Sequence, residues 1–109
     1  MVTPRKNACA VIVTVEAGPD AMPDLEAHAR YGLTRFPEFS GFISAALHKS
    51  ADGSRLVQYV CWRTEAEYLA CVNDPQWDEV PSTGRFMQLI ESGEARMDVR
   101  VYEVVASVP

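Results

Sequence analysis

The dipeptide Asp52-Gly53 lies between two runs of residues that favour β-strands, Phe42 to Ser50 and Arg55 to Arg63. An Asp-Gly pair between such runs is a strong hairpin signal, because both residues tolerate the backbone of a tight turn. The two runs are therefore expected to pair as antiparallel strands. Two further runs with strand character lie nearer the ends of the chain, Ala8 to Glu16 and Ala95 to Ala106.

Helical patterns separate these strands. One helix face is predicted by apolar residues at helical spacing, Leu25, Ala29, Leu33 and Phe36. Asp20 is expected to cap this helix and Pro37 to end it. A capping box, Thr64-x-x-Glu67, predicts the start of a second helix, which runs to about Asn73.

The segment Gln76 to Gly84 is expected to be an irregular loop, followed by a helix over Arg85 to Glu91. The resulting order, β-α-β-β-α-β, is typical of a ferredoxin-like α+β fold with one four-stranded antiparallel sheet. With 109 residues, the chain is expected to form a single domain over 1–109.

The strand Ala8 to Glu16 is apolar at both alternating sets of positions, so both of its faces are expected to be covered. Helices cover only one face of a ferredoxin-like sheet. The simplest cover for the other face is the sheet of an identical subunit, packed about a two-fold axis. The sequence therefore predicts a homodimer whose two sheets form a barrel-like core.

Charge and hydropathy argue against nucleic acid and membrane partners. The net charge is −5, and the ten basic residues are scattered rather than clustered as phosphate binding requires. No stretch approaches the roughly 20 apolar residues of a membrane span. The start, Met1 to Lys6 followed by an apolar run, faintly resembles a signal peptide, but the run is short and β-branched, which favours a strand.

The cysteines and histidines argue against a metal centre. The three cysteines, Cys9, Cys61 and Cys71, show no CxxC spacing, and the chain has two histidines. Buried thiols in a reducing cytoplasm are the preferred interpretation. We therefore expect no metal and a cytoplasmic location.

The strand Arg55 to Arg63 carries the candidate site. Side chains alternate along a strand, so Gln58, Val60 and Trp62 share one face. A buried amide must form a hydrogen bond, so Gln58 pairs either with a neighbour or with a ligand. Trp62 either fills the core or lines a cavity with its indole N–H, and Tyr68 follows on the next helix near the same strand end.

Several of these residues also carry a resemblance to a known family. The chain resembles the antibiotic biosynthesis monooxygenase superfamily in Gly41 to Ala45, His48, Asp52-Gly53, Gln58-Tyr59-x-x-Trp62, Glu65 and Tyr68. The resemblance implies a small dimeric α/β-barrel protein. Its best-understood branch oxygenates polyketide anthrones to quinones with dioxygen and no metal or flavin, and other branches degrade haem or handle quinones. Haem is disfavoured here, because no histidine follows His48.

The resemblance also implies roles for particular residues. Gln58, where an Asn is usual in the anthrone-oxidising branch, and Trp62 are expected to donate hydrogen bonds to a developing oxyanion. His48 or Tyr68 is expected to move the proton. Apolar walls for a small aromatic substrate are expected from Phe36, Phe42, Ile43 and Leu69.

Other candidates have two interpretations each. Trp77 closes the cavity as a lid or anchors its loop, and Arg85 either stabilises an anionic intermediate or is a solvated helix residue. His48 faces the same side as Gln58 only if the hairpin has an extra residue or a bulge, because a plain two-residue turn pairs Leu47 with Gln58 instead. His28, one step off the apolar stripe of its helix, is interpreted as a half-exposed packing residue, with a cavity group as the alternative.

The sequence thus predicts a cofactor-independent monooxygenase that oxidises an anthrone-like or quinol substrate with dioxygen. One alternative is a non-catalytic, dimeric binding or sensory module that holds a quinone-like hydrophobic ligand in the same cavity. Another is an accessory subunit with a filled core.

Overall fold

The computed structural model describes residues 8–109 and contains one four-stranded antiparallel sheet in the order β2-β3-β1-β4. The strands are β1 (Cys9–Ala17), β2 (Phe42–Lys49), β3 (Arg55–Trp62) and β4 (Ala95–Glu103). The helices are α1 (Met22–Arg35), α2 (Glu65–Val72) and α3 (Pro81–Glu91), with short 3-10 turns η1 (Phe36–Glu38) and η2 (Pro75–Glu79). The predicted α+β, ferredoxin-like order of elements is confirmed.

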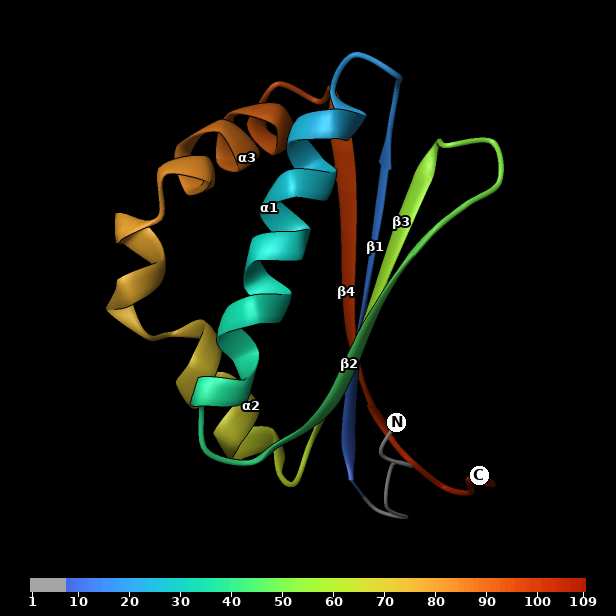
Figure 1. The fold of residues 1–109 in the computed structure, drawn as a ribbon, viewed down its shortest axis with the longest axis vertical. Coiled ribbons are helices and arrows are strands. Elements are labelled where there is room, and N and C mark those ends of the chain that lie inside the picture. Colours follow the sequence, from blue (N-terminus) through green and yellow to red (C-terminus); the bar gives the residue numbers. More distant parts are fainter. Residues whose placement is uncertain (1–7) are drawn as a thin grey trace.

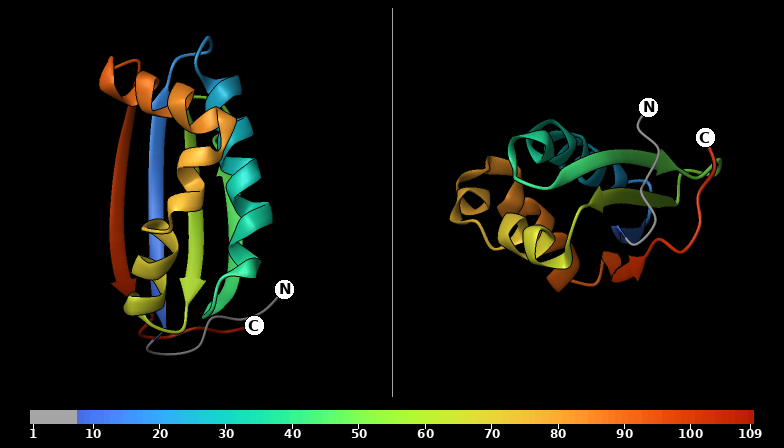
Figure 2. Two further views of the ribbon diagram at one scale, coloured as in Figure 1. Left: turned by 90° about the vertical axis from the view of Figure 1, so that its left-hand side faces the viewer. Right: turned by 90° about the horizontal axis from the view of Figure 1, so that it is seen from below.

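All helices lie on one face of the sheet, and no helix covers the other face within residues 8–109 (Figures 1 and 2). The interpretation of Met1 to Lys6 as the start of a strand or of a signal peptide falls outside the described residues. Within them, no helix is both long enough and apolar enough to cross a membrane.

Two helix starts differ from the prediction. Asp20 does not cap α1, because the N-cap is Ala21 and the Gly18 carbonyl accepts the Met22 N–H at 3.1 Å in a local turn. The segment expected to be a loop before Arg85 instead contains η2 and the first turn of α3. Pro81 begins α3, where a missing N–H is tolerated, so this helix starts earlier than its apolar pattern suggested.

The hairpin has the register of a plain turn. Leu47 pairs with Gln58 and His48 with Val57, and the only irregularity between β2 and β3 is a bulge between Phe42 and Ser44 at the far end of the pair. Since paired residues share a face, His48 points to the side of the sheet opposite Gln58.

The buried core on the helix side forms two clusters. One cluster joins Val15 and Leu56 to α1 and α3, and the other joins Val60 and Trp62 to α2. Val13, in the middle of β1, is only partly buried and contacts both clusters. The sheet is therefore filled near both ends, and the space over its middle is left for the site.

Candidate functional site

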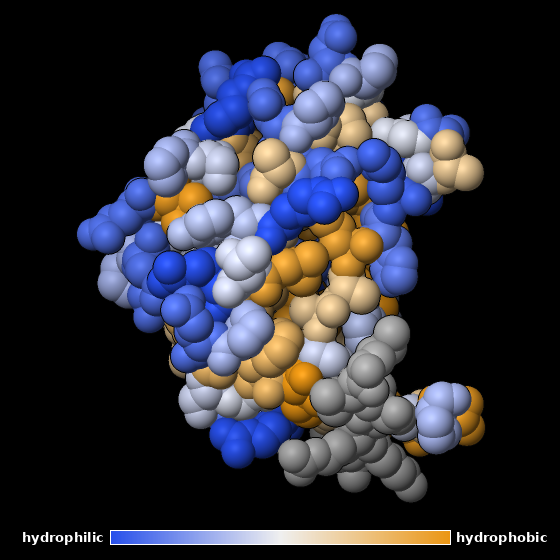
Figure 3. All heavy atoms as spheres, in the orientation of Figure 1, coloured by the Kyte–Doolittle hydropathy of each residue, from blue (hydrophilic) through white to orange (hydrophobic). Residues whose placement is uncertain are grey.

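A cavity of about 390 Å³ lies between the helix side of the sheet and the three helices. This volume is in the range of pockets that bind small molecules. Met97 and Val99 of β4 line it and are both 43% exposed, so the cavity opens to solvent along this edge strand. Figure 3 shows further hydrophobic residues at the surface along the line between α1 and the sheet.

The wall is mostly aliphatic and aromatic, and its polar groups are few. They come from His28 on α1, Gln58 and Trp62 on β3, Tyr68 on α2 and Trp77 on η2. No charged side chain of residues 8–109 belongs to this wall. The cavity therefore favours a neutral, flat, apolar ligand that carries a few hydrogen-bonding atoms.

Gln58 lies at the centre of the sheet, between Val13 on β1 and Leu47 on β2. Both neighbours are apolar, and no described residue forms a hydrogen bond with the Gln58 side-chain amide. The first of its two sequence interpretations, a bond to a neighbour, is therefore not what the structure contains. The amide faces the cavity with both its donor and its acceptor unused.

Trp62 fills the core and lines the cavity at the same time. Its side chain is 1% exposed and meets Phe36 and Phe42 edge-on, at ring-centroid distances of 6.2 Å and 5.8 Å. No side chain or carbonyl of residues 8–109 accepts a hydrogen bond from the indole N–H. A rigidly held donor thus remains free at the end of β3.

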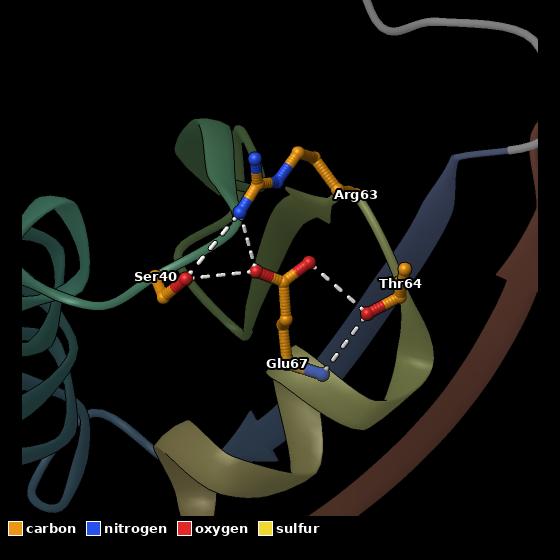
Figure 4. A network of polar contacts seen from close by, with 4 residues as sticks. All are labelled: Ser40, Arg63, Thr64 and Glu67. Carbon is orange, nitrogen blue, oxygen red and sulfur yellow. Dashed lines mark hydrogen bonds and ion pairs between the residues drawn. The ribbon is translucent and has the colours of Figure 1, made fainter.

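A polar network holds the corner between β3 and α2 (Figure 4). The Thr64 hydroxyl accepts the Glu67 N–H at 3.2 Å, as the capping box predicts, while the Glu67 carboxylate binds Arg63 at 2.6 Å and Ser40 at 2.9 Å. The Arg63 hydrogen bond, followed by the Ser40 bond, lowers the pKa of Glu67 below its usual value. Because Trp62 and Tyr68 flank this corner, the network fixes the relative position of two wall residues.

Tyr68 and Trp77 line the cavity in different ways. Burial, followed by the nearby Cys9, raises the pKa of Tyr68, so its hydroxyl stays protonated at neutral pH. Trp77 donates its indole N–H to the Cys71 carbonyl at 2.8 Å and stacks on Phe39. Trp77 is therefore an anchored part of the wall rather than a free lid.

The structure places the two histidines on opposite sides of the sheet. His48 is exposed on the helix-free side of the sheet and does not line the cavity, because the hairpin has the plain register. His28 is half-buried and does line it. Its signal was present in the sequence, because α1 and the η1 turn after it place residues at helical spacing on the wall: Leu25, His28, Ala29, Gly32 and Phe36.

Four other predicted site residues do not line the cavity, although Phe36 does. Phe42 packs behind Trp62, and Ile43 is the extra residue of the β2 bulge. Leu69 is 45% exposed on the outer side of α2. Arg85 is exposed and pairs with Asp24 of α1 at 3.1 Å, so it is a surface residue that links two helices.

Within residues 8–109, no group of three or more His, Cys, Asp or Glu side chains could hold a metal ion. The three cysteines are free thiols, and all are buried. Burial raises the pKa of the Cys71 thiol to about 12. Their burial makes all three thiols packing groups of the core.

The fold and the cavity define a ferredoxin-like α+β protein with an apolar, ligand-sized site. Two solved structures are similar to this protein over nearly the whole chain. SnoaB from Streptomyces nogalater, a cofactor-independent oxygenase, is 12% identical with a TM-score of 0.73, covering 94% of this chain and 98% of its own. A Deinococcus radiodurans protein, provisionally named as an antibiotic biosynthesis monooxygenase, is 8% identical with a TM-score of 0.72, covering 93% and 96%.

Among curated proteins, tetracenomycin-F1 monooxygenase of Streptomyces glaucescens is 47% identical over 36 residues. This match spans 33% of the chain and 32% of that enzyme. No family model matches the chain. The protein has the fold of the antibiotic biosynthesis monooxygenases, which confirms the resemblance found in its sequence.

Proposed function

We propose that this protein is a monooxygenase that oxidises an electron-rich aromatic substrate, of the anthrone or quinol type, with dioxygen and without a metal or flavin. The proposal is carried by two groups in the apolar wall, the Gln58 amide and the Trp62 indole N–H, which have no hydrogen-bond partner within residues 8–109. The strand rise of about 3.3 Å per residue separates their Cα atoms by roughly 13 Å. That span matches a flat, fused-ring ligand with oxygen atoms near its ends.

The chemistry requires little from the protein beyond this cavity. An anthrone loses an acidic proton to become an enolate, which is electron-rich enough to pass one electron to dioxygen. The radicals combine to a peroxide at the former CH₂ carbon, and loss of water leaves the quinone carbonyl. Overall, one CH₂ and one O₂ become one C=O and one H₂O, so the substrate supplies all the electrons.

The wall residues have distinct roles in this reaction. The Gln58 N–H₂ and the Trp62 N–H donate hydrogen bonds to oxygen atoms of the substrate anion, one of which is the enolate oxygen, and such donors are most effective where water is excluded. The Tyr68 hydroxyl is a third donor. Phe36 and the aliphatic wall hold the rings of the substrate and keep water away from the peroxide.

We also propose that the working form is a homodimer that packs through the helix-free side of the sheet. Ile12, Val57 and Tyr59 on this side are half-buried, and no helix of the described chain covers them (Figure 1). A second copy would bury them and add to the modest core that a chain of 109 residues can form.

Oxygen uptake with dithranol, a dihydroxyanthrone, tests the function. The purified protein, treated with a chelator, is expected to consume one O₂ per quinone formed, above the rate of dithranol alone. Trp62→Phe and Gln58→Leu should each slow turnover by about tenfold or more, because each removes one donor to the oxyanion. Gln58→Asn, which keeps the amide, is the matched control and should retain most of the activity.

The same samples separate the rival function. If the protein is a binding module, dithranol or its quinone will raise the melting temperature without oxygen uptake. Equal turnover in the wild type, Trp62→Phe and Gln58→Leu would contradict the roles given to the two donors.

A further inference from the structure

His28 and Ser82 form a polar pair at the cavity, although they lie 54 residues apart in the sequence. His28 Nδ1 is 2.6 Å from the Ser82 hydroxyl, which comes from the first turn of α3. The imidazole also stacks on Phe86 of α3, with a centroid distance of 4.6 Å and an interplanar angle of 23°. Two contacts from one helix thus hold the ring in a single orientation.

The other ring nitrogen is unused. No described residue forms a hydrogen bond with His28 Nε2, although the ring is half-buried and lines the cavity beside the apolar wall. Burial lowers the pKa of His28, so the imidazole is neutral at neutral pH. When a histidine holds one nitrogen against a fixed hydroxyl, the other nitrogen is the one available to a ligand.

We propose that His28 Nε2 is the base that removes the proton from the bound substrate, and that Ser82 positions it by accepting a hydrogen bond from Nδ1–H. This inference rests on the proposed function and names the proton acceptor that the reaction needs. The proton moves from the acidic C–H or O–H of the substrate to Nε2, and the electron pair stays on the substrate as the enolate. The Nδ1–H bond to Ser82 persists in the imidazolium, so the charged form keeps its partner.

Among the titratable groups in and around the cavity, His28 is the one suited to accept a proton. Tyr68 is the other titratable residue of the wall. Burial raises the pKa of its hydroxyl, so Tyr68 is suited to donate a hydrogen bond rather than to accept a proton. Among the charged groups of the packed helices, Asp24 of α1 pairs with Arg85 of α3 at the surface. Glu26 of α1 binds Arg30 and Lys49 at 2.8 Å each, also outside the cavity wall.

The protonation of His28 can be read directly by long-range ¹H–¹⁵N NMR. The chain has two histidines, so His48→Gln assigns the two ring spectra. In the free protein at neutral pH, His28 is expected to be neutral with its proton on Nδ1. Under anaerobic conditions, dithranol should convert the ring to the doubly protonated form, with the substrate anion appearing in the absorbance spectrum. A proton found on Nε2 in the free protein would overturn the proposal.

Kinetics test the same step during turnover. His28→Gln should lower oxygen uptake at neutral pH by about 100-fold or more, the usual contribution of a general base. The loss should shrink as the pH rises and dithranol ionises in solution. Ser82→Ala should give a smaller loss, Ser82→Thr should keep the rate, and His48→Gln is the control with wild-type activity.

The outcomes distinguish this inference from the proposed function. If the wild type consumes oxygen and His28→Gln is equally fast, the base is not His28, while the function stands. A loss in His28→Gln that does not shrink with pH, at an unchanged melting temperature, likewise overturns the base. If the wild type shows anaerobic proton transfer to His28 but no oxygen uptake, the base stands and the monooxygenase function fails.

Discussion

Gly41 has a positive φ of +88°, and a Cβ at this position would lie 2.3 Å from the Glu67 carboxylate carbon. Glu67 cannot move aside freely, because Arg63, Ser40 and Thr64 all bind its carboxylate (Figure 4). This single residue therefore combines a backbone requirement with a packing requirement. Both serve the corner that carries Trp62.

Replacing Gly41 separates these two requirements. Gly41→Ala should lower the free energy of unfolding by about 2–3 kcal/mol, of which about 1–2 kcal/mol is left-handed backbone strain. Gly53→Ala is the matched control, with a φ of +76° and no atom within 4 Å of the new Cβ, so it should lose only the strain. Urea unfolding measures both. Equal losses of unfolding free energy in Gly41→Ala and Gly53→Ala would contradict the clash with Glu67. So would an excess loss in Gly41→Ala that persists when Glu67 is also changed to Ala.

At the scale of elements, the β2–β3 hairpin is closed by Asp52. Its carboxylate accepts the Ser54 N–H at 3.0 Å and the hydroxyls of Ser54 and Ser50 at 2.7 Å each. These bonds, led by the Ser54 backbone N–H, lower the pKa of Asp52 from 3.8 to about 2. The turn that fixes the register of the whole site therefore depends on an ionised carboxylate.

The hairpin should contribute to the pH dependence of stability. Since the folded pKa lies below the unfolded one, the contribution of Asp52 is complete above about pH 4 and is lost as the pH falls towards 2. Asp52→Asn keeps the turn geometry but cannot titrate. The difference in urea midpoint between the wild type and Asp52→Asn should shrink as the pH falls from about 5 to about 2. Parallel curves for the two proteins would show that Asp52 is not linked to folding.

Helix starts were harder to predict than strands. The strands follow from alternation and from the Asp-Gly turn, which are local properties of a few neighbouring residues. Asp20 looked like a cap, but the turn from Gly18 already satisfies the first N–H groups of α1. At the start of α3, Val80 is extended before Pro81, and the Thr83 hydroxyl donates to the Trp77 carbonyl of η2 at 2.8 Å. The apolar pattern of the sequence records neither feature.

At the scale of the whole molecule, the proposed dimer predicts a sensitive surface. Ile12 lies near the middle of the helix-free side, paired with Tyr59 on β3 and Arg100 on β4. Arg100 already pairs with Asp98 at 3.0 Å. An additional carboxylate buried there costs several kcal/mol, so Ile12→Glu should dissociate the dimer. Ala27→Glu, on the exposed side of α1, adds the same charge and should remain dimeric. Sedimentation equilibrium at micromolar concentration gives the answer, and a monomeric wild type would refute the dimer.

The sequence alone was sufficient for the order of the elements, the hairpin, the capping box and the shared face of Gln58 and Trp62. Each of these depends on alternation, helical spacing or turn chemistry within a few residues, and such short-range geometry is nearly independent of the rest of the chain.

Only the tertiary structure decided which histidine reaches the cavity. The strand register turned His48 away, and the packing of α3 on α1 brought Ser82 and Phe86 to His28. It also decided that the Gln58 amide has no hydrogen-bond partner within residues 8–109, because that depends on Val13 and Leu47 from two other strands. A cavity is formed by what distant segments leave unfilled, and no local pattern records that space.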